Sequence, residues 1–139
     1  RVFYVRESGV FEILGVTITG GSDFYGGGIS NSGDLTLTNS AVSNNSATTN
    51  GDGGGIYQRG NEKANLTLNN SRICHNEASV GAIYLERSGT VTINNSVICS
   101  NSGVGIYADS ARAIYDGHTG SDELNLEANF GLLGLVPSE

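Results

Sequence analysis

The stretch of sequence that decides the fold is Leu35-Thr-Leu-Thr-Asn-Ser-Ala-Val-Ser-Asn-Asn45, because its pattern occurs three more times along the chain. The other copies superpose on it without internal gaps and cover 11–21, 66–76 and 91–101. Successive copies start 24, 31 and 25 residues apart. A repeat whose length varies while its strands stay intact is typical of a solenoid, which tolerates insertions at its turns.

Apolar residues occupy equivalent positions in every copy, and each copy is followed by a Gly-rich approach to an Ile. Alternation with a period of two places these side chains on one side of short strands. The sixteen expected inward residues are Phe11, Leu35, Leu66, Val91, Ile13, Leu37, Leu68, Ile93, Ile18, Val42, Ile73, Ile98, Ile29, Ile56, Ile83 and Ile106. We therefore predict an all-β fold, a right-handed single-stranded parallel β-helix (a solenoid) of about four to five coils with three short strands per coil.

The β-helix is expected over 1–113, with a partial coil at 1–10 followed by full coils at 11–34, 35–65, 66–90 and 91–113. In the partial coil, Phe3 falls in the Ile column and Tyr4 falls in the column of the later tyrosines. Because the chain begins in mid-coil, it is interpreted either as a fragment of a longer helix or as a solenoid whose open end pairs with another strand.

The apolar pattern fails after Ile114. We expect 115–122 to form a loop and Leu124 to start one more strand. The segment 114–139 as a whole is expected to be a loop followed by an apolar tail. The tail either caps the last coil or docks as a strand on another protein.

Two columns of asparagine are expected at the corners of the coils, namely Asn39, Asn70 and Asn95 in one and Asn45, Asn76 and Asn101 in the other. Asn tolerates left-handed backbone angles. Its side-chain amide can also bond to the same amide one coil away, at about 4.8 Å. Both columns are therefore interpreted as structural.

The charge balance excludes one class of partner. The chain has 7 basic and 14 acidic residues and a net charge of −7, whereas nucleic-acid binding needs clustered Lys and Arg. Only Arg59 and Lys63 come close to a basic pair. No stretch approaches the roughly 20 apolar residues of a membrane span. We expect neither a nucleic-acid partner nor a membrane span.

The strings Leu35-Thr-Leu-Thr-Asn-Ser40, Ser43-Asn-Asn-Ser-Ala47 and Gly53-Gly-Gly-Ile-Tyr57 resemble the GGA-I and F-x-x-N repeats of polymorphic outer-membrane proteins and of autotransporter passenger domains. The resemblance covers roughly 3–107, with Ser43, Cys74 and Cys99 at the Phe position of F-x-x-N. It implies a bacterial, extracellular or cell-surface module with a structural or adhesive role. The same architecture also carries polysaccharide lyases and phage tailspikes, so the non-enzymatic function that we expect rests on the lack of a recognisable catalytic centre in the sequence.

Catalytic residues, metal ligands and cofactor sites are not indicated by the sequence. His75 adjoins Cys74, but side chains of neighbouring strand residues point to opposite sides. His118 lies near Asp116 and Asp122, where a weak cation site competes with a solvated loop. A polysaccharide lyase needs acidic residues gathered for calcium, and the acidic residues here fall in unrelated columns, so that activity is less favoured. No cofactor is expected.

One outward face is rich in hydroxyl and amide side chains, and its candidate residues are Thr36, Thr38, Thr67, Asn69, Thr92 and Asn94. Flat Thr ladders suit ice or crystal surfaces, and an outer face of this kind also suits carbohydrate. Thr is equally an ordinary outward strand residue. The sequence leaves three kinds of partner as alternatives. They are glycans, a surface, and neighbouring copies that assemble into fibres through open solenoid ends.

Cys74 and Cys99 occupy one column of adjacent coils, 25 residues apart. Stacked in register, their Cα atoms would be about 4.8 Å apart, which a disulfide allows. The alternatives at this point are a disulfide that staples two coils and a pair of reduced, partly exposed thiols.

Overall fold

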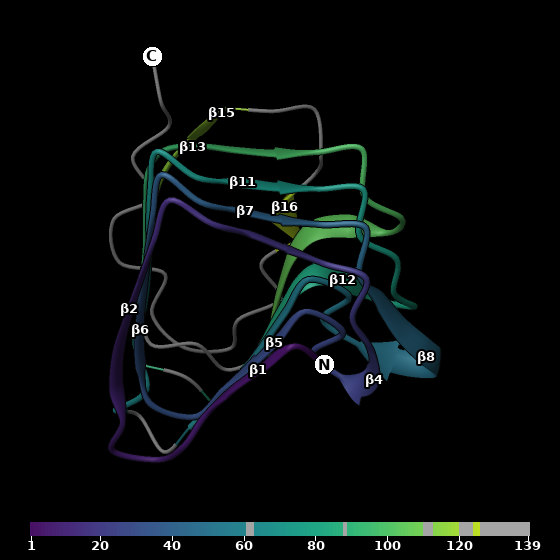
Figure 1. The fold of residues 1–139 in the computed structure, drawn as a ribbon, viewed down its shortest axis with the longest axis horizontal. Coiled ribbons are helices and arrows are strands. Elements are labelled where there is room, and N and C mark those ends of the chain that lie inside the picture. The colour runs from purple at the N-terminus through teal and green to yellow at the C-terminus, as the bar shows by residue number, and fades with distance from the viewer. Residues whose placement is uncertain (61–62, 88, 110–112, 120–123, 126–139) are drawn as a thin grey trace.

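In the computed structural model, residues 1–60, 63–87, 89–109, 113–119 and 124–125 are described, and every regular element among them is a β-strand. The chain winds as a solenoid, and each strand pairs in parallel with the strand one coil further along. Figure 1 shows that the coils are stacked and that each coil has a roughly triangular outline, whose three sides carry the strands. The predicted parallel β-helix is confirmed.

The first side of the triangle carries the strands that open each repeat. These are β2 (Val10–Leu14), β6 (Asp34–Thr38), β10 (Leu66–Asn69), the first part of β13 (Thr90–Cys99) and β15 (Ala113–Thr119). Leu35 pairs with Phe11 and Leu66, and Leu66 pairs with Val91. The gap-free alignment of the four repeats is therefore the structural register, and we call this side the first face.

The other two sides complete each coil. The second face contains β3 (Thr17–Thr19), β7 (Ala41–Ser43), β11 (Arg72–Cys74) and the second part of β13. The third face contains β1 (Phe3–Val5), β5 (Ile29–Asn31), β9 (Ile56–Arg59), β12 (Gly81–Glu86), β14 (Val104–Asp109) and β16 (Leu124–Asn125). Two further strands, β4 (Ser22–Tyr25) and β8 (Ser46–Asp52), pair with each other and project as a wing between the second and third faces (Figure 1).

The core consists of the predicted inward columns. Fifteen of the sixteen residues are buried, and the exception is Phe11, which is 49% exposed in the first coil. Burial of each such side chain contributes about 1.5–3 kcal/mol, which opposes the entropy lost on ordering the chain. Phe3 pairs with Ile29, and Tyr4 and Tyr57 both pair with Ser30, so the predicted register of the partial coil is also correct.

A fifth inward column lies on the third face and was absent from the sequence prediction. It consists of Val5, Asn31, Gln58, Leu85 and Ala108, all buried. The signal was present, because a period of two places the residue two after each Ile inward. Two members are amides, so the apolar pattern did not reveal the column.

The side-chain amide of Gln58, in this column, is only partly hydrogen-bonded. Its Oε1 accepts a hydrogen bond from Asn31 Nδ2, but its Nε2 is buried without a hydrogen-bond partner among the described residues. We expect Gln58→Leu to raise the free energy of unfolding by about 1 kcal/mol, because an unsatisfied buried donor is removed. Chemical denaturation measures the change.

Asn31→Leu is the matched control for this substitution. The Asn31 side chain bonds to both backbone groups of Gly33, at 3.0 and 3.1 Å. Its loss should therefore destabilise the protein by about 1–3 kcal/mol. A Gln58→Leu protein that is less stable than the parent would show that the Gln58 amide is satisfied in solution.

The C-terminal boundary differs from the expectation. Residues Ala113–Thr119 form β15, which pairs with β13, instead of the predicted loop from Tyr115. Strand pairing uses backbone groups and does not need an apolar pattern in the side chains. The strand expected at Leu124 is β16 and pairs with β14. The expected cap or docking tail lies at 126–139, outside the described residues.

The two corners use different residues for backbone geometry and for side-chain ladders. At the first corner Asn39, Asn70 and Asn95 are left-handed, with φ of 49°, 48° and 46°, as predicted. They do not build the buried ladder there. It is built by the residues that follow them, Ser40, Ser71 and Ser96, whose hydroxyls accept hydrogen bonds from backbone N–H groups of the preceding coil.

At the second corner the predicted asparagines themselves build the buried ladder. The Asn45 amide donates to Asn76 Oδ1 and the Asn76 amide donates to Asn101 Oδ1, each at 3.1 Å, which confirms the predicted amide ladder. The left-handed residues are the ones before them, Asn44 and His75 among them. Each buried amide also bonds to backbone carbonyls, so the ladder fixes the corner without exposing polar groups to the core.

Candidate functional site

The predicted Thr/Asn face lies on the outside of the first face. Thr36, Thr67 and Thr92 stack in register, and so do Thr38, Asn69 and Asn94. Asn94 Nδ2 donates a hydrogen bond to Asn69 Oδ1 at 2.9 Å. The ladder ends in the first coil, where Glu12 and Leu14 occupy the equivalent positions. The structure therefore brings all six candidate residues together in a patch that is three coils long.

A disulfide joins Cys74 to Cys99 on the second face. The two residues are in register on β11 and β13, with Cα atoms 4.8 Å apart. Cys74 is buried although it occupies an outward position, and Arg72 Nη2 lies 3.8 Å from Cys99 Sγ. The bond staples the third repeat to the fourth from the outside.

Aromatic rings form a second outward ladder on the third face. Tyr57 stacks on Tyr84, with ring centroids 5.7 Å apart, and Tyr84 stacks on Tyr107 at 5.2 Å. Ser30 occupies the same column one coil earlier, and the Tyr25 ring from the wing lies 4.7 Å from Tyr57. The wing thus extends the ladder where the column itself has no ring.

Burial and nearby carboxylates oppose ionisation of two of these tyrosines. Burial, followed by the hydrogen bond from the Tyr57 hydroxyl to Glu86, raises the pKa of Tyr57 above its usual range. Burial, followed by the charges of Asp52 and Asp109, raises the pKa of Tyr84 to about 12. The stabilisation tied to their neutral form is therefore complete below pH 10, the usual tyrosine pKa, and is lost as pH rises through the folded-state values.

An absorbance titration of tyrosinate should show at least two groups that ionise well above the usual tyrosine pKa of 10. The late groups should shift back to the usual tyrosine pKa when the protein is unfolded in denaturant. Glu86→Gln should lower the pKa of Tyr57, because it removes a negative charge beside the hydroxyl. A single transition at the usual tyrosine pKa in the folded protein would contradict the stacked and buried ladder.

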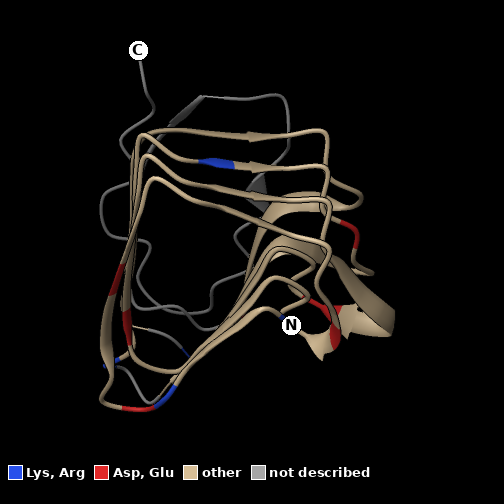
Figure 2. Ribbon diagram, viewed as in Figure 1, with Lys and Arg blue, Asp and Glu red and all other residues tan. Residues whose placement is uncertain are grey.

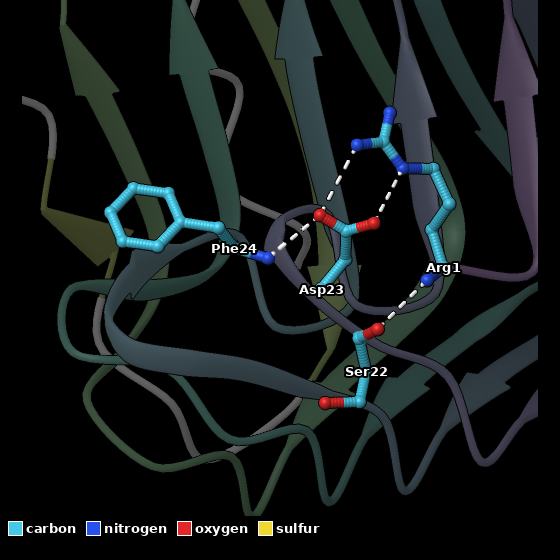
Figure 3. Close-up of polar contacts among 4 residues, drawn as sticks. All are labelled: Arg1, Ser22, Asp23 and Phe24. Carbon is cyan, nitrogen blue, oxygen red and sulfur yellow. Dashed lines mark hydrogen bonds and ion pairs between the residues drawn. The ribbon is translucent and has the colours of Figure 1, made fainter.

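Arg1 is held against the wing by an ion pair and a backbone hydrogen bond. Arg1 Nε and Nη2 donate to the two carboxylate oxygens of Asp23 at 2.9 and 3.1 Å, and the terminal amine donates to Ser22 O (Figure 3). The Arg1 hydrogen bonds lower the pKa of Asp23 to about 2. This pair is partly exposed, so it orients the wing more than it stabilises the fold.

Large exposed apolar side chains gather at the same end of the solenoid. Among the residues with described side chains they are Val2, Phe3, Tyr4, Val10, Phe11, Leu14, Val16, Phe24 and Tyr25. All of them belong to the partial coil or to the first full coil, whose strands β1, β2 and β3 are edge strands. The edge strands of these first coils therefore carry exposed apolar side chains.

Comparison with known proteins matches residues 2–119 to the family model described as the right-handed β-helix region. The chain belongs to the right-handed β-helix family. No curated protein and no solved structure matches it. The match ends at Thr119, where β15 ends, so the family's coils continue past the expected boundary at 113.

Within this β-helix, the residues considered for chemistry do not converge. His75 is exposed, and its neighbour Cys74 is held in the disulfide. Among the described residues, no group of three His, Cys, Asp or Glu side chains could hold a metal ion, and no helix could span a membrane. The side chain of His118 and the whole of Asp122 lie outside what is described. The outward side chains of the described residues form ladders along the solenoid axis, and the residues considered for chemistry are not gathered into one catalytic or metal-binding cluster.

Proposed function

We propose that this chain is a non-enzymatic structural and adhesive β-helix module that works outside the cell, at a bacterial surface. The observation that carries the proposal is the Cys74–Cys99 disulfide between neighbouring coils. Disulfides persist in secreted and surface proteins and are rare in the reducing cytosol. A staple in this position suits a repeat protein that must stay folded outside the cell.

The outer faces also support an adhesive role. Contact residues are repeated once per coil, as in the Thr36, Thr67 and Thr92 column and in the tyrosine ladder. A repeated row of hydroxyl, amide and aromatic groups offers the same contact several times along an axis. Such a surface suits a repetitive partner, and glycans are the first class to test.

The location is tested on intact producing cells. Surface proteins are labelled with a membrane-impermeant biotin reagent, free thiols are alkylated before lysis, and the chain's peptides are mapped without reductant. We expect biotin-labelled protein and a linked peptide pair that contains Cys74 and Cys99. Alkylated cysteines in unlabelled protein would contradict a function outside the cell.

Adhesion is tested separately with the purified chain on a glycan array. We expect saturable binding by the folded chain and none by Leu37→Asp, whose core is disrupted. Equal retention of both proteins would reveal nonspecific adsorption and contradict the adhesive role.

Ice or crystal-surface binding is a second candidate, supported by the in-register ladder of Thr36, Thr67 and Thr92. The flat patch is only three coils long, about 10 Å between its outer rungs, and Glu12 ends it. We therefore place this function behind the adhesive one. Thermal hysteresis that disappears in Thr67→Lys would reverse the order.

A further inference from the structure

The Cys74–Cys99 disulfide lies on the outside of the solenoid, away from the packed core. It joins outward positions of β11 and β13, whereas the residues before them, Ile73 and Ile98, are fully buried. The two strands are also paired in register through their backbones. The core and the strand pairing therefore do not depend on the bond, and a chemical change at the sulfur atoms does not require the protein to unfold.

The two cysteines of this bond differ in their access to solvent. Cys74 is 2% exposed, whereas Cys99 is partly exposed. Cys74 has an in-register neighbour on both sides, Ser43 in the preceding coil and Cys99 in the following one. An attacking thiolate approaches in line with the bond that breaks, and for attack on Cys74 this line comes from the side of Ser43. Because exchange depends on access, Cys99 is the sulfur that an external thiol reaches.

A guanidinium group lies beside the accessible sulfur. Arg72 is exposed, and its Nη2 is 3.8 Å from Cys99 Sγ. Within the described part of the chain, no carboxylate forms an ion pair with Arg72. Figure 2 shows one blue segment, on β11, and no red segment along the described strands of the second face. The carboxylate of Glu77 comes only after the second corner, where it is exposed.

We propose that Cys99 is a site of thiol–disulfide exchange with small anionic thiols, which form a mixed disulfide there and open the bond between the coils. The incoming thiolate attacks Cys99 Sγ, and a new S–S bond forms as the Cys74–Cys99 bond breaks. The electron pair of the broken bond leaves on Cys74 Sγ, which takes a proton from water. The incoming thiol is oxidised and Cys74 is reduced, so the step needs no further oxidant.

The positive charge of Arg72 favours thiols that are anionic. The thiolate is the nucleophile, and a cation beside the target sulfur attracts it. A carboxylate or sulfonate elsewhere in the same small molecule adds to this attraction and can accept hydrogen bonds from the guanidinium in the adduct. The whole chain has a net charge of −7, so the attraction is confined to the surroundings of Arg72 and should weaken as salt is added.

The released Cys74 thiol has a hydrogen-bond acceptor within reach. Its Sγ lies 3.9 Å from the carbonyl oxygen of Val97, a distance that suits a weak S–H hydrogen bond. Since the thiolate is the reactive form, a buried thiol that donates to a carbonyl is slow to attack the mixed disulfide. The adduct on Cys99 should therefore persist long enough to be trapped.

Peptide mapping after a brief reaction tests which sulfur is attacked. The folded protein is treated with 2-mercaptoethanesulfonate, quenched with acid, alkylated with N-ethylmaleimide and digested without reductant. We expect the sulfonate adduct on Cys99 and the alkyl group on Cys74, in at least about tenfold excess over the reverse arrangement, because access decides the attack. Adducts shared equally between the two cysteines, adducts mainly on Cys74, or no adduct would each overturn the proposal.

Two single variants compare the sulfurs without the bond between them. Cys74→Ser leaves Cys99 as the thiol, and Cys99→Ser leaves Cys74. With the symmetric disulfide of 2-mercaptoethanesulfonate, the thiol of Cys74→Ser should react at least about tenfold faster than that of Cys99→Ser. In denaturant the two proteins should react at similar rates. Equal rates in the two folded proteins, with thermal melts that show both to be folded, would contradict the difference in access.

Arg72→Gln, placed in the Cys74→Ser protein, tests the guanidinium. It should slow the reaction with the anionic disulfide about fivefold at low ionic strength and should not slow the reaction with cystamine, which is cationic. Comparing each reagent between the two proteins removes the intrinsic difference between the reagents. Equal effects of Arg72→Gln on both reagents would overturn the preference for anionic thiols.

The exchange goes beyond the proposed function but involves the same disulfide, and a thiol count on denatured, unreduced protein separates their failures. Two titratable thiols would overturn both the exchange and the argument for a function outside the cell. An intact disulfide that gives no adduct on Cys99 would overturn the exchange alone.

Discussion

Leu37→Asp and Ile73→Asp will each abolish the cooperative unfolding transition. Both side chains are fully buried in columns whose neighbours above and below are apolar, such as Leu68 beside Leu37. A carboxylate there has no partner, and its burial costs on the order of 5 kcal/mol or more, which is close to the whole stability of an ordinary domain. Circular dichroism during heating measures the loss.

Thr67→Asp is the control, because it introduces the same charge one residue away from an inward position. Thr67 is half-buried on the outside of the first face, between Thr36 and Thr92. We expect a change in the free energy of unfolding of less than about 1 kcal/mol, as for other outward strand positions. Cooperative melting of Leu37→Asp at the parent temperature would mean that the inward columns are wrongly assigned.

Loss of the disulfide has the second largest expected effect. The bond closes a separation of 25 residues between Cys74 and Cys99. The chain-entropy model gives about 3.5 kcal/mol for such a loop, which corresponds to a melting temperature lower by about 10 °C in a chain of this size. The double variant Cys74→Ser/Cys99→Ser should therefore melt well below the parent in differential scanning calorimetry.

Serine is a suitable replacement because Ser43 already occupies this column one coil earlier. A reductant should lower the melting temperature of the parent toward that of the double variant and should leave the double variant unchanged. If the reductant leaves the parent's melting temperature unchanged, the two thiols are not bonded in solution.

The inward columns were predictable because two local regularities coincide. A period of two sets the inward residues of each strand, and four copies repeat the same apolar types at the same positions, so that Leu35, Leu66 and Val91 align by sequence alone. The column that contains Asn31 and Gln58 was missed because its members do not share a chemical type. Strand β15 was missed because its pairing with β13 depends on backbone groups.

The surface features were predictable to different degrees. Cys74 and Cys99 could be placed side by side because both lie within the gap-free repeat, although the choice between bonded and reduced thiols needed three-dimensional contacts. The approach of Arg6, Lys63 and Arg87 to one corner of the solenoid could not be predicted, because these residues lie in turns of unequal length. Only the register of the flanking strands shows that these turns lie at the same corner.

The most direct test of the stacked coils is a nuclear Overhauser experiment on methyl-labelled protein. The structure places Leu37 against Leu68 and Leu68 against Ile93, across separations of 31 and 25 residues. We predict methyl contacts along this series and along Val42, Ile73 and Ile98. Methyl contacts of Leu68 that are confined to its sequence neighbours, or that are displaced by one or two residues from Leu37 and Ile93, would contradict the β-helix register.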